Sequence, residues 1–541
     1  MPRMRVVVAF LSVVLPVVAQ SQSEQDYKKL VDLNMELVLL QGPSRVDGVP
    51  DYSSPAMESK RIELERLRKQ WASIDAETWS TSEKIDYLLV YARINEIDFG
   101  LRVVRSFSRD PGLYVDLVKR IPYADVPIFE DHLQTFRTRL ENVPKVMEQA
   151  KSNLTEPAKE LAGLAIRHLE HYDGVGQGEP WRAVPPEGTI DWYRDLIGRL
   201  KEHHPNLVPL AKEALAAVEG YRDWLASRLD QMTEPAWIGV EHFNWFLRKV
   251  RLMPYTVDDL EMLGEREFAR WSAFLAIESN KNDRRGVPSL RLATSKEEYD
   301  ARIREAERQI RDLISEQKLL SIPGDTPKEF ETDAFWTTRP GGYRHFWEEL
   351  QYRNGLNNHI HASIPGHRFD MFMRKYVENP IRATCRDGGR IEGWATYIEE
   401  MFLQAGIMDD IPRARELFYI ALMKRAARVH IELEMQKGEY SLDEANAYLI
   451  ENVPFMEENL GRYDLEGYLR RPAYGSAYLI GKIQLEKLLS DRVIQLGDTF
   501  DLGAFHDELL TAGFIPLSLL RWEMTGVDDE ARRFWEDAHR R

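Results

Sequence analysis

Hydrophobic residues along most of the chain recur three and four positions apart, which is the spacing of amphipathic α-helices. Strict alternation of apolar and polar residues, typical of a half-buried strand, is rare. The pattern therefore predicts an all-α protein. The expected helical stretches are 24–41, 55–74, 82–108, 128–154, 156–172, 191–229, 256–279 and 296–319.

Loops are expected where glycine, proline and polar residues gather. These stretches are 42–54, 174–188, 281–288 and 321–342. Two helix starts carry capping signals: Ser82 precedes an acidic first turn, and Thr256 with Asp259 is close to a capping box. The longest irregular stretch, 321–342, is expected to form one wall of a cleft.

The first residues follow the pattern of a signal peptide. Arg3 and Arg5 precede an apolar run, Val6 to Val18, and small residues lead to Ala19. The run is shorter than the ~20 residues that span a bilayer. We expect export to a periplasm or the medium with cleavage near Ala19, and an uncleaved anchor is the alternative. No cysteine follows the run, so nothing indicates a lipoprotein.

Composition supports one large folded unit after the signal peptide (1–19). With 43% hydrophobic residues and 13 Trp, residues 20–541 have ample material for a core, in one or two lobes, with the site-bearing segment at 330–490. The net charge of −16 is spread along the chain, which argues against binding to nucleic acid or anionic membranes. Cys385 is the only cysteine, which excludes an intramolecular disulfide.

Residues 358–402 hold the candidate chemistry. His361, His367 and Glu392 are two imidazoles and a carboxylate, the ligand set of a catalytic zinc that keeps one position open for water. On a regular helix the two histidines would lie about 120° apart. We expect Pro365–Gly366 to distort the helix and bring the second imidazole round. The alternative is that the histidines are polar residues lining an irregular turn.

Glu392 and Glu399 lie seven residues apart, beside an apolar helical stripe from Ile391 to Phe402. Because burying a lone carboxylate is unfavourable, we expect Glu392 to bind metal and Glu399 to hold a ligand or substrate group. The competing explanation is a set of salt bridges from Glu392 to Arg382, Arg386 or Arg390.

A second candidate segment, 470–481, opens a helix with Tyr474 and Tyr478 four residues apart. Tyrosine hydroxyls donate to a developing oxyanion, and arginine holds a carboxylate bidentately. Tyrosines at helical spacing are, however, more often part of a core.

These segments resemble a large bacterial family catalogued as a domain of unknown function. Its members carry His-Glu-x-x-Pro-Gly-His, then Glu-Gly-Trp-Ala-x-Tyr-x-Glu, then a Pro-Gly-Gln-Ala-x-x-Tyr-like segment. Residues 361–367 match except at the glutamate, residues 392–399 match throughout, and residues 472–481 match in part. Residues 51–54 and 238–260 are also similar, so the resemblance covers most of the mature chain.

The family looks like a distant branch of the gluzincin metallopeptidases, related to carboxypeptidase Taq and the oligopeptidases. The resemblance implies a large helical fold with a deep central cleft. It makes His361, His367 and Glu392 the ligands of a zinc ion and Tyr478 an oxyanion donor, while the catalytic glutamate falls on Ala362.

Other family positions also differ, since Asp370 replaces a glutamine and residues 431–435 replace Asp-x-Gly-Leu-His. Loss of a positioned general base typically costs ~10²–10⁴ in rate. Asp370, one turn beyond His367, is a candidate fourth ligand or replacement base. Glu399 is the other candidate base.

We therefore expect an exported zinc-metallopeptidase-like protein that acts on peptides or small amide-containing molecules, weakly or by altered chemistry. One alternative is a pseudoenzyme that binds a peptide or metabolite without cleaving it. Another is a metal-dependent lyase or isomerase in which Asp370 or Tyr478 moves the proton. Manganese or iron would accept similar ligands.

Overall fold

The computed structural model describes residues 22–119, 126–171, 186–330, 336–337, 339 and 342–540, so the predicted signal peptide lies outside it. The all-α prediction is confirmed, with 73% helix and 2% strand. The only sheet among the described residues is a hairpin in which β1 (Ser44–Val46) pairs antiparallel with β2 (Val49–Asp51). The prediction of a loop at 42–54 is wrong for the residues of these two strands. Asp47 and Gly48, with φ of 51° and 82°, make the two-residue turn that joins them.

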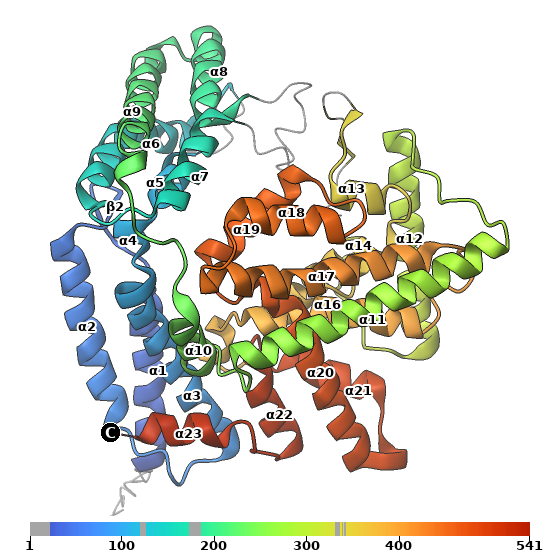
Figure 1. Cartoon of the computed structure of the whole chain (residues 1–541). Coiled ribbons are helices and arrows are strands. Elements are labelled where there is room, and N and C mark those ends of the chain that lie inside the picture. The colour runs from blue at the N-terminus through green and yellow to red at the C-terminus, as the bar shows by residue number, and fades with distance from the viewer. Residues whose placement is uncertain are drawn as a thin grey trace, which may run out of the picture.

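Three N-terminal helices lie beside the C-terminal ones (Figure 1). Helix α3 contacts α1 and α2 as well as the two C-terminal helices, α22 and α23. Ser80, not Ser82, caps α3 and forms a capping box with Glu83. The bounds are α1 (Gln22–Gln41), α2 (Ser54–Ala72), α3 (Thr81–Phe99), α22 (Leu517–Thr525) and α23 (Arg532–His539).

The helices from α5 to α9 form a lobe with its own hydrophobic core, at the upper left of Figure 1. An ion pair and a hydrogen bond join this lobe to the rest of the chain, with 2.8 Å between Arg470 Nε and Asp110 Oδ2 and 2.5 Å between His168 Nε2 and Glu466 Oε2. The bounds here are α4 (Ser106–Arg109), α5 (Pro111–Val118), α6 (Glu130–Asn153), α7 (Lys159–Glu170), α8 (Gly188–His203) and α9 (Val208–Ala226).

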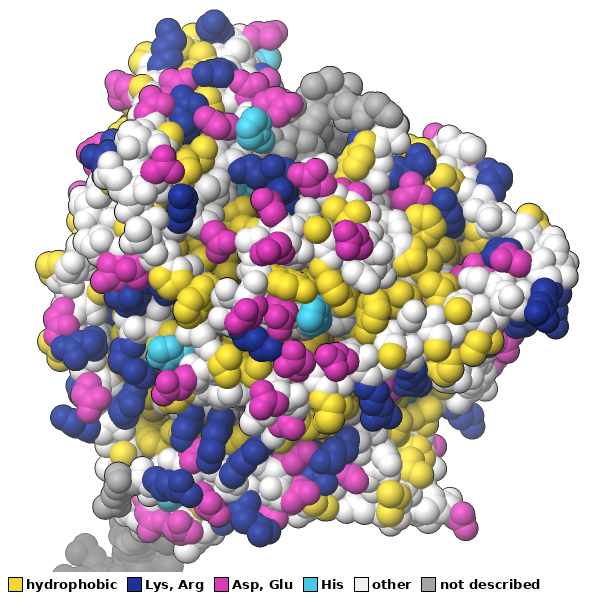
Figure 2. Space-filling view, in the orientation of Figure 1, with side chains coloured by type: hydrophobic (Ala, Val, Ile, Leu, Met, Phe, Trp, Pro, Cys, Tyr) yellow, Lys and Arg dark blue, Asp and Glu magenta, His cyan; other side chains and the backbone are white. Residues whose placement is uncertain are grey.

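Two helix pairs organise the body of the molecule: α16 (Gly388–Gln404) on α20 (Tyr474–Leu496), and α11 (Val257–Arg284) on α17 (Ala414–Lys437). Helix α11 starts at the predicted Thr256–Asp259 capping box. It ends at Arg284, so the loop predicted from 281 starts too early. In Figure 1, α11 runs diagonally across the body, and Figure 2 shows charges of both signs interspersed on the face in view.

The remaining helices surround these pairs. No helix among the described residues is long and apolar enough to cross a membrane. The predicted cleft wall, 321–342, lies partly outside the described residues, as does most of the predicted loop 174–188. The bounds are α10 (Gly239–Lys249), α12 (Lys296–Gln317), α13 (Phe346–Gln351), α14 (Leu356–Ala362), α15 (His367–Met373), α18 (Leu442–Asn452), α19 (Glu458–Arg470) and α21 (Leu502–Thr511).

Candidate metal centre

The two candidate histidines lie on either side of a break between helices. His361 is in the last turn of α14, and His367 is the first residue of α15. A Cβ on Gly366 would lie 1.8 Å from the His361 carbonyl oxygen, so only glycine allows this close approach. The predicted distortion is present, and the two imidazole centroids are 4.7 Å apart.

Helix α16 brings Glu392 to this break. The Trp394 indole, two residues after Glu392, is fully buried and donates from Nε1 to the Pro365 carbonyl oxygen at 2.9 Å. Trp394 therefore fastens the turn between the histidines to the helix that carries the carboxylate. In the Glu-Gly-Trp segment, Trp394 therefore positions the turn, and Glu392 is a candidate metal ligand.

The three predicted ligand residues converge. One ligand atom each from His361, His367 and Glu392 lie within 4.8 Å of one another. Glu392 Oε2 is 3.2 Å from His367 Nε2 and 3.9 Å from His361 Nε2. Ligand atoms bound tetrahedrally to zinc at ~2.0–2.1 Å lie roughly 3.3 Å apart. The donor types and their spacing therefore fit one divalent cation.

The protonation states also suit metal binding. Burial, with Arg425 and His367 nearby, lowers the pKa of His361 well below its ordinary value, so the imidazole is neutral. Burial opposes ionisation of Glu392, but the adjacent histidines prevail and lower the pKa of this carboxyl to about 2. Two of the three side chains thus have the charge that metal coordination requires.

Glu399 lies behind His361. Its Oε1 is 2.7 Å from His361 Nδ1 and 2.5 Å from Arg425 Nη2, and its Oε2 accepts from Asn357 Nδ2 at 2.8 Å. Burial raises the pKa of Glu399 to about 7, while Arg425 acts in the opposite direction. Glu399 and Arg425, whose Nη2 lies 3.2 Å from the same nitrogen, both contact Nδ1, while Nε2 of the ring faces Glu392 at 3.9 Å. Both oxygens are engaged, which favours the ligand-holding role over that of a base.

Tyr474 and Tyr478 lie at the triad. The Tyr474 hydroxyl donates to Glu392 Oε1 at 3.4 Å and lies 3.1 Å from the Tyr478 hydroxyl. Burial raises the pKa of both phenols, so both stay protonated and remain donors. Both side chains are half-buried, and Tyr474 also packs against a hydrophobic cluster that includes Tyr468. The helix start is held by Glu432, which accepts from the Gly475 and Ser476 amides at 3.1 and 2.7 Å.

The structure corrects the role predicted for Asp370. Its fully buried carboxylate accepts two hydrogen bonds from Arg390, each 3.1 Å long. Both oxygens are therefore used, and Asp370 is neither a fourth ligand nor a base in this arrangement. The alternative salt bridges from Glu392 to Arg390 and Arg382 are also wrong. Arg390 pairs with Asp370, and Arg382 pairs with Asp86.

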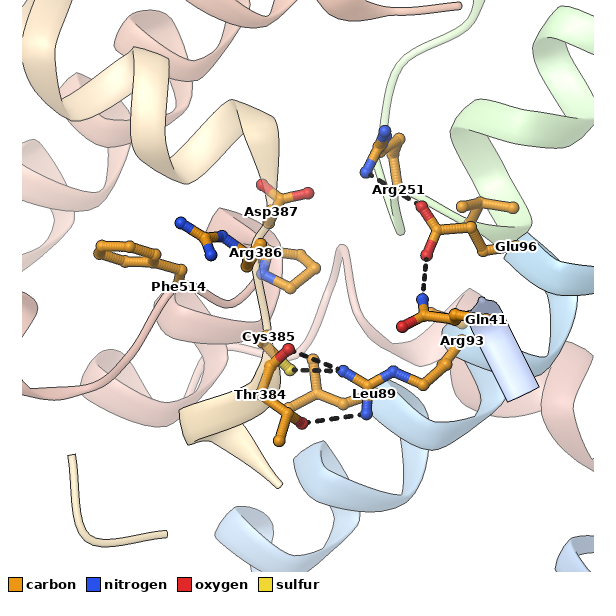
Figure 3. Close-up of a pocket in the computed structure, with 13 residues that line it drawn as sticks. Gln41, Leu89, Arg93, Glu96, Arg251, Thr384, Cys385, Arg386, Asp387 and Phe514 are labelled. Atoms are coloured by element: carbon orange, nitrogen blue, oxygen red, sulfur yellow. Dashed lines mark hydrogen bonds and ion pairs between the residues drawn. The ribbon is translucent and has the colours of Figure 1, made fainter. Parts of the chain in front are cut away.

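A separate pocket of about 260 Å³ lies at the start of α16 (Figure 3). Asp387 lines it and caps α16 by accepting from the Arg390 amide at 2.8 Å. Two arginines of this pocket have partners within it. Arg93 donates to Thr384, and Arg251 lies 3.8 Å from Glu96.

The sequence analysis missed a basic group on α17, made of Lys424, Arg425 and Arg428 (the α17 cations). All three are buried. Arg425 reaches Glu399, and Arg428 lies over the Tyr478 ring with 4.4 Å between its guanidinium carbon and the ring centroid. The available signal was that positions 424, 425 and 428 fall on one face of a helix.

Two other groups contain metal-binding residue types but are satisfied differently. His359 is not one of the converging residues and pairs through its Nε2 with Glu307. Glu261, His430 and Glu434 lie close together, but Lys437 bridges the two carboxylates at 2.9 and 2.8 Å. An ammonium already compensates this second group.

Comparison with known proteins gives a family and a fold. The family profile described as "Bacterial protein of unknown function (DUF885)" matches residues 39–318 and 296–524. No curated protein matches the sequence.

Two solved structures are similar over almost the whole chain. One is described as a "putative lipoprotein of unknown function" from Shewanella oneidensis, with 16% identity, a TM-score of 0.69, and coverage of 93% of this chain and 100% of that one. The other is described as a "putative lipoprotein" from Colwellia psychrerythraea, with 14% identity, a TM-score of 0.68, and coverage of 96% and 100%. At these identities the similarity establishes a shared fold.

Proposed function

Because the chain belongs to the bacterial DUF885 family, whose description gives no activity, we propose a function from its own side chains. We propose a zinc-metallopeptidase-like protein with a gluzincin-like fold and a deep cleft, acting on peptides or small amide-containing molecules. Its hydrolysis is weak or altered because a methyl group, Ala362, stands where the related motif has a glutamate.

The convergence of His361, His367 and Glu392 within 4.8 Å carries this proposal. These three side chains would hold the ion, which when bound supplies a Lewis acid for an amide carbonyl and for water. With the ion bound, Glu399 would accept the proton on Nδ1 of His361. Tyr478 and Tyr474 offer protonated hydroxyls to a developing oxyanion.

The weak step is proton transfer. Ala362 is buried and carries no acceptor, and the carboxylates of Asp370 and Glu399 are both engaged by arginines. A general base contributes ~10²–10⁴ in rate, so slow turnover is expected.

The test compares the natural protein with Ala362→Glu, each loaded with zinc and each assayed on a peptide library with and without chelator. We expect about one bound zinc per chain and slow, chelator-sensitive cleavage that rises by ~10²–10⁴ in the variant. Ala362→Gln is the matched control, since it adds similar bulk without a base. If neither protein binds zinc or cleaves any peptide, the proposal is wrong.

A second candidate is a binding protein that retains the site without catalysis. The engagement of both alternative carboxylates favours it. This candidate predicts zinc binding and peptide affinity with no turnover in the natural protein, even over days.

We also propose that the chain is exported. The charged, apolar and small residues of its first 19 positions support this, and so does the description of both structural neighbours as lipoproteins.

A further inference from the structure

We propose that the pocket at the start of α16 binds a free α-amino acid with an aliphatic side chain. This pocket, shown in Figure 3, is formed by residues other than the triad, so the inference goes beyond the proposed function and needs neither zinc nor turnover. Its volume of about 260 Å³ is the space of roughly nine liquid waters at ~30 Å³ each. That space suits one amino acid rather than a longer peptide.

Two side chains of opposite charge line this pocket from different parts of the chain. Arg251 follows α10 and Asp387 precedes α16, and Figure 3 shows them on opposite sides of the pocket. Burial raises the pKa of the Asp387 carboxyl, and Arg251 is the nearby cation that opposes this shift most. The two side chains are therefore close, yet the ion pair of Arg251 is with Glu96 and not with Asp387. A ligand with one positive and one negative group fits between them.

Both groups have hydrogen-bonding capacity that the protein does not use. Asp387 accepts from the Arg390 amide through Oδ1, and among the described residues no side chain or amide donates to its Oδ2. Arg251 lies 3.8 Å from Glu96, which is too long for a hydrogen bond, and its guanidinium donates to no acceptor in the described part of the chain. An ammonium group would donate to Asp387 Oδ2, and a carboxylate would accept from Arg251.

The positions of these groups limit the class of ligand. Glu96 also raises the pKa of Asp387, so a second carboxylate lies near the place of the ammonium. An α-amino acid carries its ammonium and its carboxylate on one carbon atom, so both groups can be reached across one small pocket. The other lining residues include buried apolar ones, which would remove an aliphatic side chain from water. They are Leu89, Val250, Phe514 and Pro516.

Calorimetric titration at neutral pH tests the inference with leucine and three analogues that each lack one group. Leucinamide lacks the carboxylate, 4-methylpentanoate lacks the ammonium, and glycine lacks the aliphatic side chain. We expect leucine to bind with a Kd of about 0.01–1 mM. Each analogue should bind about 10- to 100-fold more weakly, because it leaves one part of the pocket without its partner. An analogue that binds as tightly as leucine overturns the assignment of an aliphatic amino acid, and so does the absence of leucine binding.

Two measurements locate the bound leucine. Its affinity should be equal in the zinc-loaded and in the chelator-treated protein, and binding that requires zinc would place leucine at the triad and overturn the inference. Leucine at about ten times its Kd should slow the alkylation of Cys385 by iodoacetamide about tenfold, because this thiol lines the same pocket. An unchanged alkylation rate also overturns the inference.

Two variants assign the charged groups. Asp387→Asn keeps the α16 cap, since asparagine is also a favoured cap residue, and should weaken leucine about 10- to 100-fold while leaving 4-methylpentanoate unchanged. Arg251→Gln should weaken leucine by a similar factor and leave leucinamide unchanged. Arg266→Gln, at an exposed position on α11, is the control and should change no affinity. The assignment is wrong if either variant binds leucine like the natural protein, and the titrations of the natural protein decide the inference without any variant.

Discussion

Glu399 supplies no ligand atom to the triad, but with Arg425 it contacts Nδ1 of His361, while Nε2 faces the triad. Its Oε1 lies 2.7 Å from Nδ1, and Asn357 and Arg425 fix the carboxylate in turn. A neutral imidazole has one donor and one acceptor nitrogen. A cation bound at Nε2 would require the ring proton on Nδ1, and Glu399 is the acceptor within reach of that proton.

Glu399→Gln is expected to lower zinc affinity about 10- to 100-fold, because an amide is a weaker acceptor for this proton. Competition against a chromophoric chelator measures the change. Asn357→Ala, which removes only the support of Glu399, should give a smaller loss in the same direction. Glu316→Gln on the exposed face of α12 is the control. An unchanged affinity for Glu399→Gln would contradict the role assigned to this carboxylate.

Cys385 gives a clean probe of the pocket in Figure 3, since it is the only thiol in the chain. Burial raises its pKa to about 11 from an ordinary value of 9.0. Because the thiolate is the reactive form, alkylation at pH 8 should be about 100-fold slower in the native protein than in the unfolded chain. The native rate should climb with pH towards 11. Mass-spectrometric time courses with iodoacetamide measure both rates, and equal rates at pH 8 would refute the prediction.

At the scale of whole elements, the site depends on how closely α16 and α20 approach. A Cβ added to Gly393 would lie 2.5 Å from the carbonyl carbon of Gly481, and one added to Gly481 would lie 2.1 Å from the Gly389 oxygen. The backbones are in contact where one helix carries Glu392 and the other carries Tyr474. Their separation therefore sets the distance between the carboxylate and the phenols.

Gly393→Ala should force these helices apart and cost about 3 kcal/mol of stability, the upper end of the usual range for overpacking, because the contact is with backbone. Gly388→Ala is a matched control in the same helix, because its Cβ would meet only the Ala477 methyl group at an ordinary 3.9 Å. Thermal melts by circular dichroism compare the two. The packing argument fails if both variants melt like the natural protein.

The elements show what sequence reasoning reached and where it stopped. Hydrophobic periodicity predicted most of the helices. The capping box of Thr256 and Asp259 was also predicted, because the signal for a helix start lies within a few neighbouring residues. The partners of Asp370 and the burial of Arg425 depend on contacts across the fold, which spacing does not encode. The Asp47–Gly48 pair is a local signal for a two-residue hairpin turn, but the hairpin was not predicted from it.

For the molecule as a whole, the triad lies within the body, whereas α5 to α9 have a separate hydrophobic core. Both histidines belong to short helices of seven residues, which have little stability of their own. The hydrogen bond from Trp394 to Pro365 holds the turn between these helices to α16, and Gly366 allows the chain to approach the end of α14 closely. Zinc bound by His361, His367 and Glu392 would join α14, α15 and α16 in the native state only.

Zinc should therefore stabilise the fold by linkage, by about 1.4 kcal/mol for each tenfold rise of free zinc above its Kd. Scanning calorimetry over a series of buffered zinc concentrations measures this as a rising Tm, which chelator should reverse. His361→Ala should abolish the dependence, whereas His203→Ala, at an exposed position on α8, should retain it. If the lobe of α5 to α9 unfolds in a transition of its own, that transition should not move with zinc. A zinc dependence that persists in His361→Ala would place the ion elsewhere, with the carboxylate pair of Glu261 and Glu434 as the first site to examine.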